Sequence, residues 1–339
     1  MPLALSPKIG PLLLKDRFDR QITDLRVSVT DRCNFKCFYC RTPHGVHFAK
    51  RESLLTYEEI ERLAGIFVEL GVTKIRLTGG EPLLRRNLEL LAGKLSVLEG
   101  LQDLALTTNG FNFHKRAHRF KEAGLTRVTI SLDSLKRDRF REITGYPDYD
   151  DILRSIQIAK ELKLEPVKVN CVLIRGVNDD EIIDFARFAA DWDLEVRFIE
   201  FMPIDEEEAW SRDRVVTGAQ ILQTLKAEFD LKPMARETPS ETAQKFEISN
   251  GAGRIGLILP VSNPFCGNCS RARLTADGKV RTCLFSLVEH EVRGQMRAGA
   301  TDEELKKFLI STVLTKEEGH RIGEPDFVPP SRSMSYIGG

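Results

Sequence analysis

The sequence carries no net charge of either sign, because 50 lysines and arginines are balanced by 50 aspartates and glutamates. It therefore lacks the overall basic field that drives non-specific binding to nucleic acids or anionic membranes. It also lacks any apolar run near the roughly 18 residues of a membrane span. The N-terminal stretch MPLALSPKIGPLLLKDRF has neither the apolar core nor the cleavage site of a secretory signal. We expect a cytoplasmic protein that meets anionic ligands through local charges.

Cysteine is scarce, and its number is odd. The seven cysteines fall into two groups of three and one isolated residue: Cys33, Cys37, Cys40, Cys171, Cys266, Cys269 and Cys283. A disulfide framework would pair cysteines two at a time, so this pattern instead favours metal chemistry in a reducing compartment. Cys171 shares strand parity with apolar Val169, and we predict that it is a buried structural thiol rather than a ligand.

Internal repeats beyond a βα unit and low-complexity tracts are also missing. From residue 25, short β-branched runs alternate with helix-period segments through six units, ending in EVRFIEFM. Six is fewer than the eight units of a closed TIM barrel. We therefore predict an α/β fold, an open partial (β/α)6 TIM-like barrel with a smaller C-terminal α+β domain. The predicted divisions are an N-terminal extension over 1–24, the barrel over 25–215, the second domain over 216–325 and an extended tail over 326–339.

The predicted barrel strands carry polar side chains on one parity. In LRVSVT the apolar positions alternate with Arg26, Ser28 and Thr30, and in a barrel strand one parity points inward. A half-exposed sheet surface is the alternative, but a parallel sheet is usually covered on both faces. We interpret the polar parity as the lining of a wet lumen. Its other members are Lys74, Arg76, Thr78, Thr107, Asn109, Thr129, Ser131, Asp133, Lys168 and Asn170.

The first cysteine group has the spacing C-x3-C-x2-C and follows the first predicted strand directly. That position is the C-terminal rim of the strands, where barrel active sites lie. Iron–sulfur clusters are commonly held by four thiolates, so Cys33, Cys37 and Cys40 would leave one iron open to a non-protein ligand. The alternative is a zinc site completed by His44 or His47.

This spacing, with Tyr39 before the last cysteine and TGGEP at 78–82 after the second strand, resembles the radical S-adenosylmethionine (SAM) superfamily. The resemblance implies that the open iron chelates the amino and carboxylate groups of SAM. An electron from the cluster then cleaves the C5′–S bond, and the 5′-deoxyadenosyl radical abstracts hydrogen from the substrate. It also implies that Gly79 and Gly80 lie against the methionine end of SAM, where backbone without side chains allows a close approach.

The second cysteine group, Cys266, Cys269 and Cys283, again lacks a fourth member. A zinc ribbon completed by His290 is one interpretation. The same loop carries Arg271 and Arg273 at alternate positions, and arginines so placed suit bidentate pairing with phosphate oxygens.

Motifs from about residue 17 to residue 339 together resemble the GTP 3′,8-cyclase family, which performs the first step of molybdenum cofactor (molybdopterin) biosynthesis. They are LRVSVTDRCNFKCFYC, KIRLTGGEPLLR, LTTNG, ISLDSL, VKVN, GVNDDE, RFIEFMP, FCGNCSRARL, DGKV with CLF, and the terminal YIGG. The resemblance implies a lyase that converts GTP to (8S)-3′,8-cyclo-7,8-dihydroguanosine 5′-triphosphate. A second cluster would bind guanine through its open iron, while the radical takes hydrogen from ribose C3′ and the C3′ radical attacks C8. The stretches at 206–214 and 331–335 match only loosely.

The same resemblance implies two [4Fe-4S] clusters, held by the two cysteine groups, with SAM as cofactor. It assigns Tyr39, Gly79, Gly80, Ser131 and Met202 to SAM. It assigns Arg26, Arg76, Thr107, Lys168, Arg197, Arg271 and Arg273 to GTP. It assigns catalytic roles to Arg26, Gly338 and Gly339, the last two as the end of a tail that enters the barrel. A glycine pair lacks side chains and has broad conformational freedom, so it can thread a narrow channel; an ordinary frayed terminus is the alternative.

The implied partners besides GTP are an electron-donor protein and cyclic pyranopterin monophosphate synthase as the next pathway enzyme. A homodimer is left open, and neither nucleic acid nor membrane is expected as a partner. Two other functions compete with this one. The first is a radical SAM enzyme that modifies peptides or matures sulfatases, and the second is a zinc-stabilised binding module without catalysis.

Overall fold

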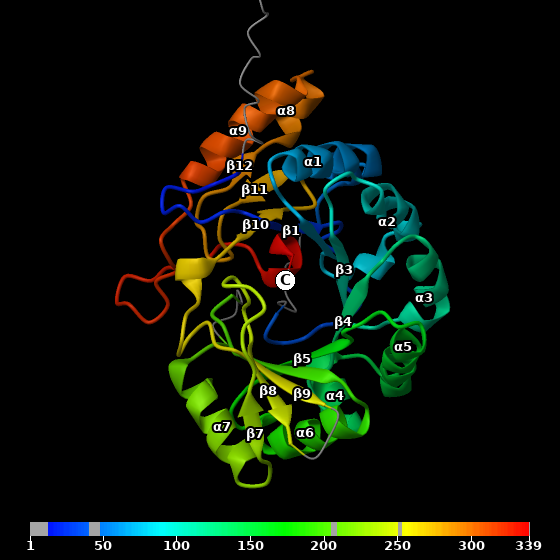
Figure 1. Ribbon diagram of the computed structural model, residues 1–339, viewed down its shortest axis with the longest axis vertical. Helices are drawn as coiled ribbons and strands as arrows, with labels where there is room; N and C mark the ends of the chain where they lie inside the picture. Colours follow the sequence, from blue (N-terminus) through cyan, green and yellow to red (C-terminus); the bar gives the residue numbers. More distant parts are fainter. Residues whose placement is uncertain (1–12, 41–47, 205–208, 250–252, 339) are drawn as a thin grey trace, which may run out of the picture.

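The computed structural model describes residues 13–40, 48–204, 209–249 and 253–338. Within these ranges the strands form one twelve-stranded sheet in the order β12-β11-β10-β1-β2-β3-β4-β5-β6-β9-β8-β7. Figure 1 shows the sheet curving around a central space, with most helices on its outer side. No helix in the described ranges is long and apolar enough to cross a membrane.

The six predicted strands form the contiguous centre of this sheet, and each pairs with its neighbours in parallel. They are β1 (Asp24–Ser28), β2 (Lys74–Thr78), β3 (Asp103–Thr108), β4 (Arg127–Ser131), β5 (Lys168–Leu173) and β6 (Glu195–Glu200). The helices between them are α1 (Tyr57–Glu69), α2 (Leu88–Ser96), α3 (Phe113–Glu122), α4 (Arg137–Thr144), α5 (Tyr149–Glu161) and α6 (Ile182–Asp191). This arrangement confirms the predicted α/β fold with an open partial barrel.

The alternation of apolar and polar residues explains where the core lies. Leu25 and Val27 of β1 are fully buried, as is Leu77 of β2, and they belong to the cluster that also holds the inner faces of the helices. Cys171 of β5 is fully buried in the same cluster, as its parity predicted. Burying this parity between sheet and helices leaves the polar parity facing the central space.

The C-terminal strands do not form a sheet of their own but extend both edges of the barrel sheet. At one edge, β10 (Arg271–Leu274) pairs with β1 in parallel and is followed by β11 (Lys279–Arg281) and β12 (His290–Glu291). At the other edge, β9 (Arg254–Ile258) pairs with β6 in parallel and is followed by β8 (Gln244–Ile248) and β7 (Leu231–Pro233). The helices of this part are α7 (Gly218–Lys226), α8 (Arg293–Arg297) and α9 (Asp302–Leu314).

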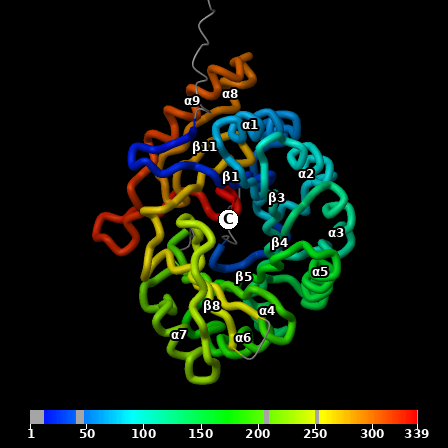
Figure 2. Tube along the Cα trace, in the orientation of Figure 1, coloured from blue at the N-terminus to red at the C-terminus, as the bar shows by residue number. Residues whose placement is uncertain are grey.

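The tail differs from the extended stretch expected over 326–339, because Met334–Ile337 form a short helix, α10. Two contacts hold this part of the tail in place. Arg332 forms an ion pair with Asp277 at 2.9 Å, and Ile337 is fully buried in a small cluster with Ile204 and Phe285. The segment up to Gly338 therefore folds back toward the barrel, where Figure 2 shows the red segment surrounded by the tube of the barrel.

Candidate active site

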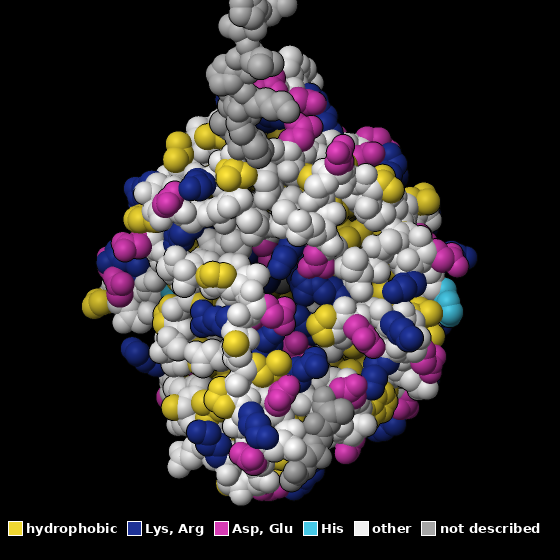
Figure 3. Space-filling model, viewed as in Figure 1, with side chains coloured by type: hydrophobic (Ala, Val, Ile, Leu, Met, Phe, Trp, Pro, Cys, Tyr) yellow, Lys and Arg dark blue, Asp and Glu magenta, His cyan; other side chains and the backbone are white. Residues whose placement is uncertain are grey.

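Two adjoining cavities of about 200 and 290 Å³ occupy the space inside the curved sheet. They share lining residues, among them Thr107, Asn170, Met202 and Met334, so they form two halves of one lumen. We call the half that contains Cys33 the first cavity and the half that contains Cys269 the second cavity. Figure 3 shows the molecule hollowed near its centre, where Lys and Arg side chains gather beside Asp and Glu.

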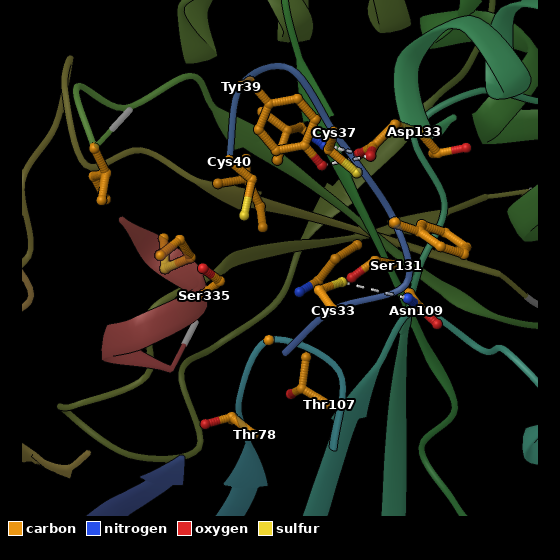
Figure 4. Close-up of a pocket in the computed structure, with 18 of the residues that line it drawn as sticks. Cys33, Cys37, Tyr39, Cys40, Thr78, Thr107, Asn109, Ser131, Asp133 and Ser335 are labelled. Carbon is orange, nitrogen blue, oxygen red and sulfur yellow. Dashed lines mark hydrogen bonds between the residues drawn. The ribbon is translucent and has the colours of Figure 1, made fainter. Parts of the chain in front are cut away.

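The first cysteine group lies on one wall of the first cavity, in the loop that follows β1 (Figure 4). This loop is fixed by Phe35, whose side chain is buried and stacks on Tyr146 with ring centroids 4.8 Å apart. The Lys36 N–H donates to the Thr144 carbonyl at 2.7 Å. The aromatic anchor holds the backbone, while the cysteine side chains face the open space.

The surroundings of the first cysteine group are acidic. Tyr39 Oη donates to Asp133 Oδ2 at 2.5 Å. Burial raises the pKa of Asp133 to about 6, although hydrogen bonds from Tyr39 and from the Val172 N–H oppose the rise. Burial also raises the pKa of Cys37 well above its ordinary value, and the negative charges of Asp133 and of the neighbouring thiols add to that rise. Three thiols in such an environment fit a cationic iron–sulfur core, whose positive charge would compensate for theirs.

Each zinc alternative needs a histidine as its fourth ligand. In the part of the chain that the structure describes, no three His, Cys, Asp or Glu side chains are arranged to hold a single metal ion, and this applies to both cysteine groups. His44 and His47 lie outside the described residues. His290, the expected fourth ligand of the second group, instead shares a hydrogen bond with Thr315 Oγ1 through its Nε2 at 3.2 Å.

Gly79 and Gly80 line the first cavity. Contacts with the backbone of Thr30 and Arg32 explain why both positions need glycine. A Cβ added at Gly80 would lie 2.4 Å from the Arg32 carbonyl oxygen, and one at Gly79 would lie 2.6 Å from that of Thr30. The Gly80 N–H donates to the Thr30 carbonyl at 2.8 Å. The pair thus lets the end of β2 pack directly against the backbone that leads into the cysteine loop.

Four residues that line this cavity belong to the predicted polar parity but have no predicted role: Thr78, Asn109, Asp133 and Asn170. Asn109 Nδ2 lies 3.9 Å from Cys33 Sγ and 2.9 Å from Asn34 Oδ1. Asp133 contacts Tyr39, as described above. Three residues that the resemblance assigns to SAM also line the first cavity: Tyr39, Ser131 and Met202. Buried Glu81, which sequence reasoning left without a function, accepts hydrogen bonds from the Asn109 N–H and from Thr108 Oγ1, both at 2.7 Å, and so joins β2 to β3.

The second cavity is lined by cations that the strand register brings into rows. Arg273 of β10 pairs with Arg26 of β1, which pairs with Arg76 of β2. The Arg26 Nε is buried without a hydrogen-bond partner, and so is the Oδ1 of Asn170. All residues that the family resemblance assigns to GTP line this cavity: Arg26, Arg76, Thr107, Lys168, Arg197, Arg271 and Arg273.

Crowding of these cations makes their charges costly. Burial, followed by repulsion from Arg271, lowers the pKa of Arg26 to about 10. Burial and the charge of Arg127 lower the pKa of Arg76 to about 9. Burial and the charge of Arg197 lower the pKa of Lys168 to about 7. A polyanion in the second cavity would relieve this repulsion and would satisfy the orphaned donor of Arg26.

Glu195 is the acidic counterpart of these cations that sequence reasoning missed. It is buried and forms ion pairs with Arg197 and, at 3.8 Å, with Lys168. The attraction of Arg197 and Lys168 outweighs the effect of burial and keeps the pKa of Glu195 below its ordinary value. The alternation in EVRFIE, which puts Glu195 and Arg197 on one face of β6, was the signal that could have revealed it.

The second cysteine group lines the second cavity. Burial alone would raise the pKa of Cys269, but the charges of Arg271 and Lys316 outweigh it and lower the pKa to about 6. Arg271 Nη2 lies 3.4 Å from Cys269 Sγ. Because the thiolate is the form that binds metal, this environment fits a thiolate-held iron–sulfur cluster.

The tail reaches the lumen from the side of β1. Ser335 lines the first cavity (Figure 4), and Met334 lines both cavities. The Gly338 carbonyl accepts a hydrogen bond from Arg273 Nη1. A Cβ added at Gly338 would lie 2.6 Å from Thr78 Oγ1, and the backbone there has a φ of +82°. Gly339 lies outside the described residues.

Two protein families match successive parts of the chain. The Radical SAM superfamily matches residues 27–189, and the family described as Molybdenum Cofactor Synthesis C matches residues 194–322. Among curated proteins, the GTP 3′,8-cyclase of Rhodopirellula baltica is 43% identical over 333 residues, which cover 97% of this chain and 93% of that protein. The mitochondrial GTP 3′,8-cyclase of Arabidopsis thaliana is 42% identical over 96% of this chain and 84% of its own length.

Solved structures resemble the chain at lower identity. Streptococcus suis SuiB bound to S-adenosylmethionine has a TM-score of 0.60 with 12% identity, over 91% of this chain and 76% of that one. Another structure of Streptococcus suis SuiB has a TM-score of 0.57, and the match spans 86% of this chain and 65% of that one. At this identity the likeness concerns the fold alone.

Proposed function

The chain belongs to the GTP 3′,8-cyclase family of the radical SAM superfamily, and from this membership we propose that it converts GTP to (8S)-3′,8-cyclo-7,8-dihydroguanosine 5′-triphosphate. The reaction is the first step of molybdenum cofactor biosynthesis. The observation that carries the proposal is a single lumen with one cysteine group in each half and a set of buried and partly buried cations in the second half. Such a lumen can hold SAM and a nucleoside triphosphate side by side.

Two [4Fe-4S] clusters are proposed, one on Cys33, Cys37 and Cys40 and the other on Cys266, Cys269 and Cys283. When bound, the first supplies the electron that cleaves the C5′–S bond of SAM, and the second supplies an open iron for the guanine base. The thiols are the residues that hold them. The aromatic anchor at Phe35 and the Asn109 contact to Cys33 Sγ keep the first cysteine group oriented.

SAM is proposed to bind in the first cavity. The glycine pair that closes β2 against the cysteine loop supplies exposed backbone there. Tyr39, held by Asp133 at 2.5 Å, presents an aromatic face, while Ser131 and Met202 complete the wall. Together these residues would hold SAM beside the first cysteine group.

GTP is proposed to bind in the second cavity. Arg26, Arg76 and Arg273 lie in adjacent strands at paired positions, so their guanidinium groups can bind several phosphate oxygens at once. Arg26 is proposed to act in catalysis as well, because it lies among the residues that would surround the ribose and phosphates. The tail, with Gly338 against Thr78, is proposed to close this part of the lumen around the reacting groups.

Proposed partners outside the chain are an electron-donor protein and cyclic pyranopterin monophosphate synthase, which would take the product onward. The cytoplasmic location and a homodimer stay predictions. The domain divisions at residues 24, 215 and 325 also stay proposals, because the terminal strands join the barrel sheet.

Incubation of anaerobically reduced protein with SAM and GTP tests the proposed function. We expect 5′-deoxyadenosine and a cyclised nucleotide to form together, and about eight iron and eight sulfide per chain in the parent protein, from two four-iron clusters. Formation of 5′-deoxyadenosine with a peptide substrate but no conversion of GTP would instead favour a peptide-modifying enzyme. Stoichiometric zinc without labile sulfide would eliminate both.

A further inference from the structure

The second cysteine group packs against a stretch that none of the recognised motifs covers. Residues 316–320, which read KEEGH and follow α9, are here called the 316–320 segment. A Cβ added at Gly319 would lie 3.3 Å from the Cβ of Cys266 and 3.6 Å from its Sγ. The segment therefore forms a close wall of the cysteine site, where a side chain at this position would be in tight contact with Cys266.

Lys316 is the charged residue of this wall, and it is 2% exposed. Its Nζ donates to the Arg271 carbonyl at 3.0 Å and to the Thr282 carbonyl. Arg271 follows Cys269 by two positions, and Thr282 directly precedes Cys283. One ammonium group thus joins the two chain segments that carry these cysteines, and because both acceptors are neutral oxygens, they do not cancel its charge.

Arg20 holds the same wall from the other side. Its side chain is 7% exposed and pairs with the fully buried carboxylate of Asp16 at 2.6 Å. Its Nη1 donates to the Cys266 carbonyl at 2.8 Å and to the Glu318 carbonyl at 2.6 Å, and its Nη2 donates to the Glu317 carbonyl at 2.5 Å. The blue N-terminal segment accordingly lies beside the orange and red C-terminal part in Figures 1 and 2.

We propose that Lys316 and Arg20 are positioning residues for the second iron–sulfur cluster, and that the buried charge of Lys316 also raises the reduction potential of that cluster. This inference rests on the proposed second cluster. A cluster held by three thiolates gains one negative charge when it takes up an electron, so an adjacent buried cation stabilises the reduced form more than the oxidised form. Arg20 is already neutralised by Asp16, so its effect is on the position of Cys266 alone.

The test compares Lys316→Met, which removes the charge and retains an unbranched side chain, with Lys316→Arg, which keeps the charge. Lys160→Met is the matched control, because the Lys160 ammonium group of α5 also donates a hydrogen bond to a backbone carbonyl. Its acceptor is the carbonyl of Trp192, at the end of α6 and away from both cysteine groups. Each loaded protein is titrated with dithionite and followed by electron paramagnetic resonance. The signal of the second cluster is identified by its absence from the Cys283→Ala variant.

We expect Lys316→Met to shift the potential of the second cluster to more negative values and to leave that of the first unchanged. Lys316→Arg should recover most of the shift, and Lys160→Met should show none. In Arg20→Gln we expect iron to fall from about eight toward about four per chain after gel filtration, with cleavage of SAM retained. This second variant decides the positioning role if Lys316→Met does not fold.

Unchanged potentials in Lys316→Met together with full iron in Arg20→Gln would overturn the inference. Equal loss of both clusters in these variants would also overturn it, because the residues would then serve general folding. Failure of the proposed function has a different signature, since a parent protein with only about four iron per chain would lack the second cluster itself.

Discussion

The two cysteine groups have the same ligand type but opposite electrostatic surroundings. Cys37 lies beside Asp133, and burial with this negative charge raises its pKa. Cys269 lies beside Arg271 and Lys316, whose charges overcome burial and lower its pKa. The difference matches the ligands proposed for the two halves. SAM carries a cationic sulfonium and tolerates an acidic wall, whereas a nucleoside triphosphate needs a cationic one.

Replacing single cysteines with alanine is the most direct test of whether the two cysteine groups have different roles. We expect Cys40→Ala to abolish SAM cleavage, because a cluster ligand of the first cavity is lost. We expect Cys269→Ala to retain SAM cleavage and to lose GTP binding and turnover. Measurement of 5′-deoxyadenosine alongside GTP affinity checks both, with Cys171→Ala as the control for a thiol outside the lumen. If Cys269→Ala bound GTP as tightly as the parent, the proposed contact of the base with iron would be wrong.

Removal of one cation from the second cavity should give the next largest effect. In Arg76→Ala we expect GTP affinity to fall by about 2–5 kcal/mol, the usual cost of truncating one partner of a buried charge pair, which is about 30-fold or more. SAM binding should be unchanged, since Arg76 lines only the second cavity. Calorimetry with each ligand measures the split. Arg62→Ala on the surface of α1, where Arg62 pairs with exposed Asp302, is the control and should change neither affinity.

The sequence revealed both cysteine groups and the inward parity, because ligand spacing and strand alternation are local patterns. Arg26, Arg76, Lys168 and their neighbours could therefore be placed in one lumen without a structure. The sheet edges could not be predicted, since the parallel pairing of β10 with β1 joins distant segments and leaves no trace in periodicity. Lys316 was missed for the same reason. Its significance depends on two carbonyl oxygens that lie eleven residues apart in the sequence, those of Arg271 and Thr282, and a single lysine at a helix end ordinarily predicts a solvated charge.

A change in the tail shows whether the two cavities act together in the reaction. Ala at residue 338 would need a Cβ 2.6 Å from Thr78 Oγ1 at a φ of +82°, and strained backbone of this kind costs about 1–3 kcal/mol. We expect Gly338→Ala to lower cyclisation by about 5- to 150-fold if the whole cost falls on the active arrangement, with both clusters and SAM binding intact. Gly323→Ala is the control, because Gly323 also has a positive φ but lies against Arg212 near the surface. If Gly338→Ala and a protein extended beyond Gly339 both formed as much cyclised product as the parent, the tail would be an ordinary terminus without a role in catalysis.

The smallest expected effect is a pH dependence of GTP binding in the second cavity. Burial and Arg197 lower the pKa of Lys168 from 10.5 to about 7, so the lysine is largely neutral above that pH in the free protein. A bound triphosphate favours the charged form, and binding above pH 7 must therefore take up a proton at Lys168. The dissociation constant of GTP should then rise with pH, by at most about tenfold per unit, between pH 7.5 and 8.5.

The stability of the free protein should increase over the same pH range, although its affinity for GTP falls. The unfolded chain holds the Lys168 proton up to pH 10.5. Unfolding therefore takes up a proton between pH 7 and 10.5, and the free energy of unfolding increases with pH. Calorimetry in two buffers of different ionisation enthalpy measures the proton uptake that accompanies GTP binding, and Lys168→Met serves as the control. Lys168→Met should bind GTP more weakly and lose the dependence, whereas the same slope in parent and variant would assign the proton to another group.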